Sequence, residues 1–335
     1  MPEKRLIDVV VDGLREEMAR DERVLVFGED VGLAGGVTGV TAGLYKDFPL
    51  HLPDGAPPSR CFDTPLNEIA IAALAIGLSI NGYRPVAEMQ FADFTAPAFD
   101  QIVNEAARMR FRSNGQFGCP MVIRTQYGCT RGTALYHSQS IEAFYAHVPG
   151  LKVVAPVMPY DCKGMLKTAI RDDDPVIFLE HKRAYRHVKE EVPDGDYTVP
   201  FGKAKIRREG GDCTIITYGY MLIVSLEAAE MLAAEGVSCE VIDLMSINPL
   251  DEETVLNSVG KTGRAVIVYE DNKFMGFGAE VAAIIAEKAF QHLDAPVTRV
   301  AGPFVPGAPF AITLEDAYLP NAEKIAAAIK KVVAF

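Results

Sequence analysis

Residues 61–101 read CFDTPLNEIAIAALAIGLSINGYRPVAEMQFADFTAPAFDQ, a pattern that predicts strand, helix, strand and helix. Thr64 suits an N-cap and Pro65 suits the first helical position, so we expect the first helix to begin there. Its first turn carries Glu68, and the apolar run IAIAALAIGLSI that follows is typical of a helix buried on all sides. Asn81-Gly82 is a suitable end for this helix.

Glu68 is an acid at the entrance of this apolar helix. An acid in a first helical turn also favours the helix dipole, and that alone would explain its presence. The next expected strand, Pro85–Phe91, favours a functional site instead. It brings Gln90, Asp93 and Phe94 near its carboxyl end, where open α/β sheets bind their ligands. We therefore predict a ligand site built from Glu68 and this strand end.

Length and composition restrict the class of protein. A chain of 335 residues that is 49% hydrophobic predicts two domains with large buried cores. The net charge of -12 argues against a nucleic-acid surface, and no apolar run is long enough to predict a membrane span. The N-terminus resembles neither a secretory signal nor a transit peptide, and the six cysteines lack CxxC spacing. We expect a cytoplasmic protein of bacterial or archaeal type with reduced thiols.

Strands and helices alternate along the chain, which predicts an α/β fold with parallel sheets covered on both faces. The expected helices are Leu6–Arg20, Pro97–Arg110, Tyr160–Arg171, Leu222–Glu235, Glu252–Ser258, Gly278–Phe290 and Glu323–Val333. The expected strands include Val24–Phe27, Met121–Thr125, Lys152–Pro156, Val176–Glu180, Asp212–Thr217, Cys239–Leu244, Ala265–Tyr269 and Val297–Val300. The charged segment Lys182–Pro200 interrupts this alternation, so we predict one domain over residues 1–190 and a second over 191–335.

Three loops are rich in glycine or proline. The G-x-G-x-x-G pattern that binds dinucleotides between a strand and a helix is absent from the two glycine-rich loops, Gly32–Gly39 and Gly276–Gly278. The third expected loop is Pro53–Ser59. A nicotinamide-binding dehydrogenase is therefore disfavoured. We interpret both glycine-rich loops as surface or interface segments.

Motifs along the whole chain carry a family resemblance. They are GEDVG at 28–32, FDTPLNE at 62–68, EMQFADF at 88–94, AFDQIVNEAARMRFRS at 98–113, LYHSQSIEAFYAHVPGLKVV at 135–154, DPVIFLE at 174–180, EVIDL at 240–244 and KTGR at 261–264. Together they resemble the beta subunit of the thiamine-diphosphate-dependent decarboxylase component of branched-chain 2-oxo acid dehydrogenase complexes, a transketolase-like family.

The resemblance implies a transketolase pyrimidine-binding domain followed by a transketolase C-terminal domain. It also implies an assembly of two alpha and two beta chains, with the cofactor bound where an alpha and a beta chain meet. The implied activity is oxidative decarboxylation of branched-chain 2-oxo acids, of the 2-oxoisovalerate type. The acyl group would then pass to the lipoyl group of the acyltransferase core.

The resemblance also implies roles for single residues. Glu68 matches the catalytic glutamate that hydrogen-bonds the pyrimidine nitrogen of thiamine diphosphate, a task suited to a carboxyl group in an apolar site. Phe94 matches the aromatic residue that stacks on that ring, where branched-chain members often have tyrosine. Leu66 and Gln90 match positions of the cofactor pocket. His137 matches the catalytic histidine that helps acyl transfer to the lipoyl group.

Two metal sites belong to the family. A structural monovalent cation, usually potassium, would be held at Cys119, Met121, Val122, Ala169, Asp172 and Asp174. Carbonyl and carboxylate oxygens suit a hard cation, although an exposed acidic helix end explains Arg171–Pro175 equally well. The G-D-G motif for Mg²⁺ and the diphosphate is absent from the sequence. The resemblance therefore implies that the alpha subunit holds that end of the cofactor.

Two alternatives stay open within the resemblance. The beta subunit of the pyruvate-specific enzyme is a close relative, and Gln90–Phe94 with His137–Ser140 favours the branched-chain type. A non-catalytic subunit that only docks the acyltransferase core is the other alternative. The presence of both Glu68 and His137 argues against it.

Overall fold

The computed structural model describes residues 1–50 and 58–335, so most of the expected loop Pro53–Ser59 lies outside the described residues. Contacts divide the chain into two units. The first contains Met1–Tyr127 and Phe144–Phe201, and the second contains Gly128–Ala143 and Gly202–Phe335. The segment Gly128–Ala143 thus interrupts the first unit in sequence but belongs to the second by its contacts.

The first unit continues past residue 190, where we placed the domain boundary, as far as Phe201. The rings of Tyr160 and Tyr197 stack with their centroids 4.6 Å apart. Gly164 leaves room for Val199, because a Cβ at this glycine would lie 2.5 Å from the valine Cγ2. The charged segment that interrupts the sequence pattern therefore packs back onto the first unit.

A parallel sheet forms the centre of the first unit, with its strands in the order β6-β7-β5-β4-β2-β3. These strands are β2 (Val24–Gly28), β3 (Cys61–Asp63), β4 (Arg84–Met89), β5 (Val122–Tyr127), β6 (Lys152–Val154) and β7 (Val176–His181). Every residue of β5 and β7 is buried, as expected of strands covered on both faces. A separate antiparallel pair joins β1 (Glu3–Arg5) to β8 (Lys189–Glu191).

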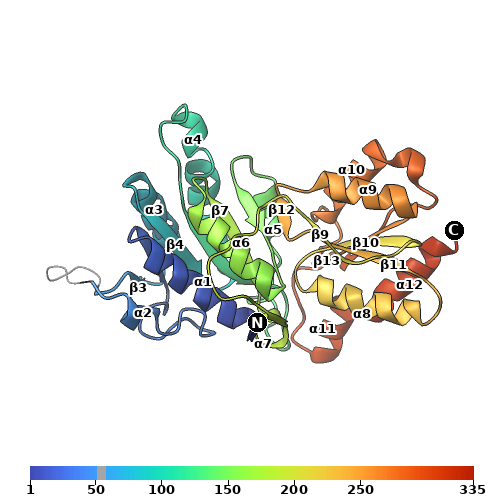
Figure 1. The fold of residues 1–335 in the computed structure, drawn as a ribbon, viewed down its shortest axis with the longest axis horizontal. Helices are drawn as coiled ribbons and strands as arrows, with labels where there is room; N and C mark the ends of the chain where they lie inside the picture. Colours follow the sequence, from blue (N-terminus) through green and yellow to red (C-terminus); the bar gives the residue numbers. More distant parts are fainter. Residues whose placement is uncertain (51–57) are drawn as a thin grey trace. The chain divides into compact units, whose positions relative to one another are not determined.

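Helices cover both faces of this sheet. The helices of the first unit are α1 (Leu6–Arg20), α2 (Leu44–Asp47), α3 (Glu68–Ile80), α4 (Met109–Arg112), α6 (Pro159–Arg171) and α7 (Ala184–His187). Helix α5 (Glu142–Ala146) begins in the segment Gly128–Ala143, which is assigned to the second unit. Helices α1 and α6 lie side by side (Figure 1). The expected continuous helix Pro97–Arg110 is wrong: a 3-10 helix (Ala92–Ala98), a π-helix (Gln101–Ala106) and α4 follow one another. Pro97 lies inside the first of these and cannot donate a backbone hydrogen bond.

Helix α3 begins later than predicted. Its N-cap is Asn67, whose side-chain oxygen accepts a hydrogen bond from the Ala70 N–H at 3.0 Å. Glu68 is therefore the first helical residue, and Thr64 and Pro65 lie outside the helix. The prediction of Thr64 as the cap was wrong because an asparagine stood next to the acid and caps equally well.

The predicted burial of α3 on all sides is also wrong. Ile71, Ala72, Ala75, Ile76 and Ser79 form its buried face. Ile69, Leu74 and Ile80 remain 45%, 39% and 43% exposed. An exposed apolar helix face of this kind is typical of a surface that contacts another chain.

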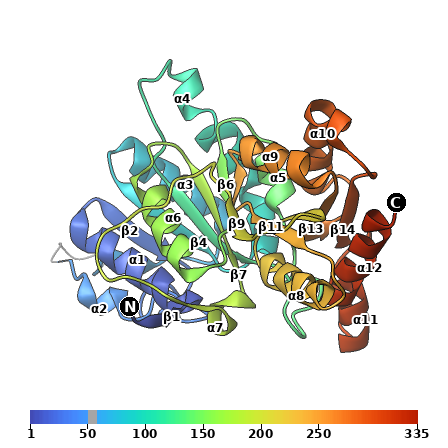
Figure 2. The same cartoon turned by 45° about the vertical axis from the view of Figure 1, so that its right-hand side comes forward.

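The second unit has a sheet with the strand order β14-β13-β10-β11-β9. Its elements are β9 (Lys205–Arg208), β10 (Cys213–Thr217), α8 (Met221–Ala233), β11 (Cys239–Asp243), β12 (Ser246–Asn248), α9 (Glu252–Thr262), β13 (Ala265–Asn272), α10 (Gly278–Lys288), a 3-10 helix (Phe290–His292), β14 (Thr298–Gly302), α11 (Ile312–Tyr318) and α12 (Ala322–Val333). Helices α9 and α10 lie on one side of the sheet, and α8 and α12 on the other (Figure 2).

The α/β fold predicted from the alternation is confirmed in both units. In the second sheet β9 departs from the parallel arrangement, because it pairs with β11 in the antiparallel direction at the edge. This strand is four residues long and charged, so the sequence gives little strand signal there. No helix in the described ranges is long and apolar enough to cross a membrane.

Candidate functional site

The carboxyl ends of three neighbouring parallel strands form the candidate site in the first unit. Gly28 at the end of β2 is in register with Asp63 of β3 and Glu88 of β4. Glu29 follows directly after β2, while Glu68 and Gln90 come shortly after β3 and β4. The sheet therefore brings Glu68 and Gln90 to one edge, where parallel sheets bind their ligands.

Glu29 connects these two predicted residues. Its side chain is only 7% exposed, and its Oε1 has no hydrogen-bond partner in the described part of the chain. Burial, followed by the nearby carboxylate of Glu68 and that of Asp30, raises the pKa of Glu29. The Gln90 side-chain amide donates to the Glu29 carbonyl oxygen at 3.3 Å. A buried carboxyl group near another carboxylate holds its proton more tightly, so Glu29 is suited to proton handling next to Glu68.

Sequence reasoning did not single out Glu29. It stands in the GEDVG motif immediately after a strand in which every residue is buried. An acid at the carboxyl end of a buried parallel strand is the same signal that identified Gln90. A systematic search of all strand ends would therefore have found it.

Phe94 and Leu66 keep accessible surface near this edge. Phe94 lies in the 3-10 helix after β4, is half-buried, and meets the ring of Phe91 edge-on with the centroids 5.7 Å apart. Leu66 is 81% exposed just before α3. An accessible aromatic ring and an exposed aliphatic side chain are suited to contacts with a flat heteroaromatic ring. Together with the unpartnered Glu29 oxygen, they fit the pyrimidine end of thiamine diphosphate.

His137 belongs to the second unit, within the segment Gly128–Ala143 that we call the His137 segment. The ring is half-buried. The Gly128 N–H donates to the Gln139 carbonyl at 3.2 Å and closes the segment into a loop. Inside the loop the hydroxyl oxygens of Thr133 and Ser138 lie 2.7 Å apart. Glu68 and His137 therefore sit in different units, each in a defined local structure.

Buried acids surround the base of the His137 segment. Glu142 is fully buried and accepts a hydrogen bond from the Tyr218 hydroxyl at 2.8 Å. Burial, assisted by the charge of Asp271, raises the pKa of Glu142 to about 8. Burial likewise raises the pKa of Asp271 to about 6. The raised pKa of Glu142 favours its protonated form, which reduces repulsion among these acids.

A buried ionic cluster lies in the sheet of the first unit. The Arg124 guanidinium of β5 bonds Glu88 of β4 at 2.9 Å and both oxygens of Glu180 of β7 at 2.6 and 2.8 Å. All three residues are 1% exposed, and the Tyr185 hydroxyl also donates to Glu180 at 2.5 Å. The cluster ties together three strands, β4 among them, whose end carries Gln90. Sequence reasoning did not predict it.

Comparison with known proteins agrees with this arrangement. Residues 5–188 match the family described as transketolase, pyrimidine binding domain, and residues 202–325 match transketolase, C-terminal domain. The chain is 50% identical, over 98% of both chains, to 2-oxoisovalerate dehydrogenase subunit beta of Bacillus subtilis (strain 168). This chain belongs to the family of 2-oxo acid dehydrogenase beta subunits. The predicted family and the predicted order of the two transketolase domains are confirmed.

Other relatives of this beta subunit support the same placement. It is 46% identical over the full length of both chains to pyruvate dehydrogenase E1 component subunit beta of Bacillus subtilis (strain 168). It is 48% identical, over 98% of this chain and 86% of the relative, to the mitochondrial 2-oxoisovalerate dehydrogenase subunit beta of Dictyostelium discoideum. A solved structure titled split gene transketolase, inactive beta4 tetramer, is similar with a TM-score of 0.78, 26% identity and 98% coverage of both chains.

The positions predicted to hold potassium have protein partners in this beta subunit. The Lys152 ammonium donates to both carboxylate oxygens of Asp172 at 2.6 Å, and the Arg110 Nε donates to Asp174 at 2.5 Å. The carbonyls of Cys119, Met121 and Ala169 accept backbone N–H groups at 2.7, 3.0 and 3.3 Å. Val122 opens β5. A cation bound there would share these carboxylates with two cationic side chains, and the site stays a prediction. Within residues 1–50 and 58–335, no group of three or more His, Cys, Asp or Glu side chains could hold a metal ion.

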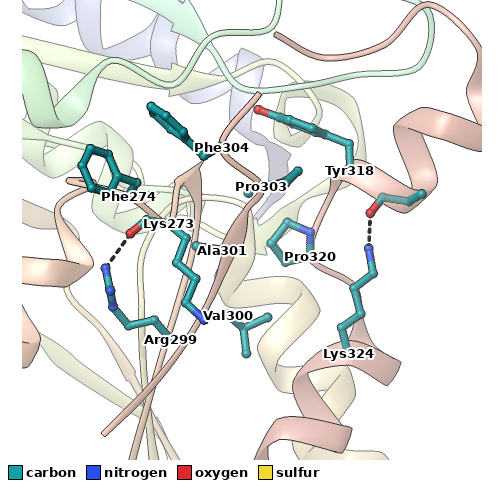
Figure 3. Close-up of a pocket in the computed structure, with 12 residues that line it drawn as sticks. Lys273, Phe274, Arg299, Val300, Ala301, Pro303, Phe304, Tyr318, Pro320 and Lys324 are labelled. Atoms are coloured by element: carbon teal, nitrogen blue, oxygen red, sulfur yellow. Dashed lines mark hydrogen bonds between the residues drawn. The ribbon is translucent and has the colours of Figure 1, made fainter. Parts of the chain in front are cut away.

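A surface hollow of about 520 Å³ lies on the second unit (Figure 3). Its lining combines aromatic and basic side chains: Phe274, Phe304, Tyr318, Lys273, Arg299 and Lys324. The Lys324 ammonium donates to the carbonyls of Ala317 and Leu319, both at 2.6 Å, and so caps the carboxyl end of α11. None of the predicted site residues lines this hollow.

Proposed function

We propose that this beta subunit acts in the oxidative decarboxylation of branched-chain 2-oxo acids, of the 2-oxoisovalerate type. It would then take part in transfer of the acyl group to the lipoyl group of an acyltransferase core. The observation that carries the proposal is the buried Glu29 near Glu68 at the strand-end edge, with a carboxylate oxygen that has no hydrogen-bond partner among the described residues. The relative that is 50% identical, a 2-oxoisovalerate dehydrogenase subunit beta, supports the substrate class. A non-catalytic docking role would not require a buried acid near Glu68.

The proposed cofactor is thiamine diphosphate. When bound, it would stabilise the negative charge that remains on the substrate after CO₂ leaves. Glu68 would hold a proton in a hydrogen bond to the pyrimidine ring nitrogen, and Glu29 would help to keep that proton in place. Phe94 would contact the face of the ring, with Leu66 and Gln90 beside it. His137 would serve the later acyl transfer as a proton donor or acceptor.

The proposal includes an alpha subunit, in an assembly of two alpha and two beta chains, that holds the diphosphate and Mg²⁺. The missing G-D-G motif supports a second chain at the site. The exposed apolar face of α3 supports a contact surface next to Glu68. We also propose a cytoplasmic location, since all six cysteines are buried free thiols, as is usual in a reducing compartment. We also propose a structural potassium ion at the positions Cys119, Met121, Val122, Ala169, Asp172 and Asp174.

The substrate class is tested with the reconstituted alpha and beta pair. We expect kcat/KM for 2-oxoisovalerate to exceed that for pyruvate by about tenfold, which is about 1.4 kcal/mol of transition-state discrimination. Steady-state decarboxylation rates on both acids measure this ratio. A tenfold preference for pyruvate would contradict the branched-chain assignment and favour the pyruvate enzyme, to whose beta subunit the chain is 46% identical.

Replacing His137 with alanine is expected to slow acylation of a lipoyl domain by roughly 10²-fold, the typical contribution of a positioned acid–base group. Decarboxylation measured with an artificial electron acceptor should change much less, because His137 is assigned to the later step. His147→Ala is the matched control, since this second histidine is exposed after α5. Unchanged acylation at limiting lipoyl domain would remove His137 from the mechanism.

A further inference from the structure

Helix α11 buries only one side chain, and that side chain is an acid. Of its seven residues, Glu315 alone is buried, with 2% exposure. Its apolar residues Ile312 and Leu314 remain 48% and 57% exposed. A surface helix normally turns its apolar residues inward. Glu315 is therefore the one fully buried side chain of this helix, and the half-buried Tyr318 packs beside it against Cys129, Ala308 and Leu319.

The partner of Glu315 lies in the His137 segment. The Gly132 N–H donates to the Glu315 Oε2 at 3.0 Å. Glu315 pairs with no cationic side chain in the described part of the chain. A buried carboxylate is costly unless hydrogen bonds compensate for the lost water. Gly132 adopts a φ of +81°, a turn that favours glycine and presents its N–H to the acid.

Further contacts fasten the same part of the segment. The Cys129 N–H donates to the carboxylate of Glu270, which lies in β13 and is 5% exposed. The Cys129 side chain packs in a buried cluster with Ala308 and Leu319. Gly307 allows close approach, since a Cβ there would lie 2.8 Å from the Leu135 Cβ. Backbone and side chains from Cys129 to Leu135 are thus held by the second unit.

We propose that Glu315 is a positioning residue for His137. It accepts the Gly132 N–H, fixes the backbone that leads to His137, and so sets where the imidazole is presented for acyl transfer. Lys324 supports this role, because its ammonium caps the end of α11 and holds the helix that carries Glu315. This inference rests on the proposed role of His137 in acyl transfer. It assigns a supporting role in that step to Glu315, a residue far from His137 in the sequence.

The test compares Glu315→Ala with Glu315→Gln in the beta subunit reconstituted with its alpha chain. Alanine removes the acceptor, whereas glutamine keeps an oxygen at the same position. For Glu315→Ala we expect kcat/KM for acylation of a lipoyl domain to fall at least about tenfold, since small displacements of reacting groups have large effects. Decarboxylation with an artificial acceptor should stay within about twofold, and Glu315→Gln should restore acylation to within about threefold of wild type. Glu323→Ala is the matched control, because this acid is exposed in the first turn of α12.

A merely structural role gives a different result. Both rates would then fall in the same proportion as the folded fraction, and glutamine would give no selective rescue of acylation. Equal losses in the two assays, or no loss in either, would overturn the proposal.

Hydrogen exchange measured by mass spectrometry tests the anchoring without any enzyme assay. Peptides from residues 128–135 should exchange at least about tenfold faster in Glu315→Ala, and at nearly the wild-type rate in Glu315→Gln. Unchanged exchange in Glu315→Ala would overturn the anchoring itself. The two proposals can fail separately. If the wild-type pair decarboxylated no 2-oxo acid, the proposed function would be wrong. The exchange result would still decide whether Glu315 anchors the His137 segment.

Discussion

Glu68→Gln is expected to lower decarboxylation by the reconstituted enzyme by at least about 10²-fold, with the fold intact. The glutamine keeps the size of the side chain but replaces one carboxylate oxygen by an NH2 group, so it cannot take up or release a proton as an acid does. Glu68 is the first residue of α3 and lies close enough to Glu29 to raise the pKa of that acid. Removing it takes away the group assigned to proton handling at the cofactor ring. Steady-state rates, with circular dichroism to verify folding, measure the effect.

The control for this variant is Glu280→Gln. Glu280 is also an acid in the first turn of a helix, α10, and it is exposed. If Glu68 only favoured its helix dipole, both variants would lose at most about 1 kcal/mol of stability and no activity. Near-normal decarboxylation by folded Glu68→Gln would defeat the catalytic assignment. Loss of activity in Glu68→Gln alone would separate the two explanations.

Arg124→Met is expected to destabilise the beta subunit by about 3–5 kcal/mol, the usual cost of removing one partner of a buried ion pair. The variant leaves Glu88 and Glu180 buried without their shared cation. Burial already raises the pKa of Glu88, even with Arg124 present. Protonation relieves an unpaired buried carboxylate, so the loss should shrink as the pH falls below neutrality. Urea unfolding at two pH values measures both effects.

Two comparisons make the Arg124 result specific. Arg112→Met breaks an exposed pair with Glu105 and should cost less than about 1 kcal/mol. Combining Arg124→Met with Glu88→Leu and Glu180→Leu replaces all three charges by apolar groups and should recover most of the lost stability. A loss below about 1 kcal/mol in Arg124→Met would show that the cluster does not hold β4, β5 and β7 together.

Much of the fold followed from periodicity. Helix α1 and the parallel strands of both sheets lie where alternating and apolar runs predicted them, because buried parallel strands and amphipathic helices leave strong local signals, whereas the antiparallel edge strand β9 was not predicted. Helix α3 shows the limit: its exposed residues Ile69 and Leu74 are as apolar as its core residues. A sequence does not distinguish a face that packs inside the chain from one suited to another chain. The π-helix Gln101–Ala106 that interrupts the expected helix Pro97–Arg110 has no comparable signal in the sequence, since Pro97 is suited to the first helical position.

The candidate site was predictable only in part. Glu68 and Gln90 could be placed together because the ends of neighbouring parallel strands converge. The environment of His137 could not be predicted, since Gly132 and its acceptor Glu315 are 183 residues apart in sequence. No local pattern reports such a pairing. The assignment of Gly128–Ala143 to the second unit depends on long-range contacts of this kind.

The central claim is that this chain supplies only the pyrimidine half of a thiamine diphosphate site. Calorimetric titration of thiamine diphosphate with Mg²⁺ into the purified beta subunit, alone and mixed with its alpha chain, tests it most directly. A buried diphosphate needs a metal ion or equivalent donors, and the sequence lacks the G-D-G motif for them. The account predicts weak binding by the beta subunit alone and tight, Mg²⁺-dependent binding once the alpha chain is added. Micromolar or tighter Mg²⁺-dependent binding by the beta subunit alone would contradict it.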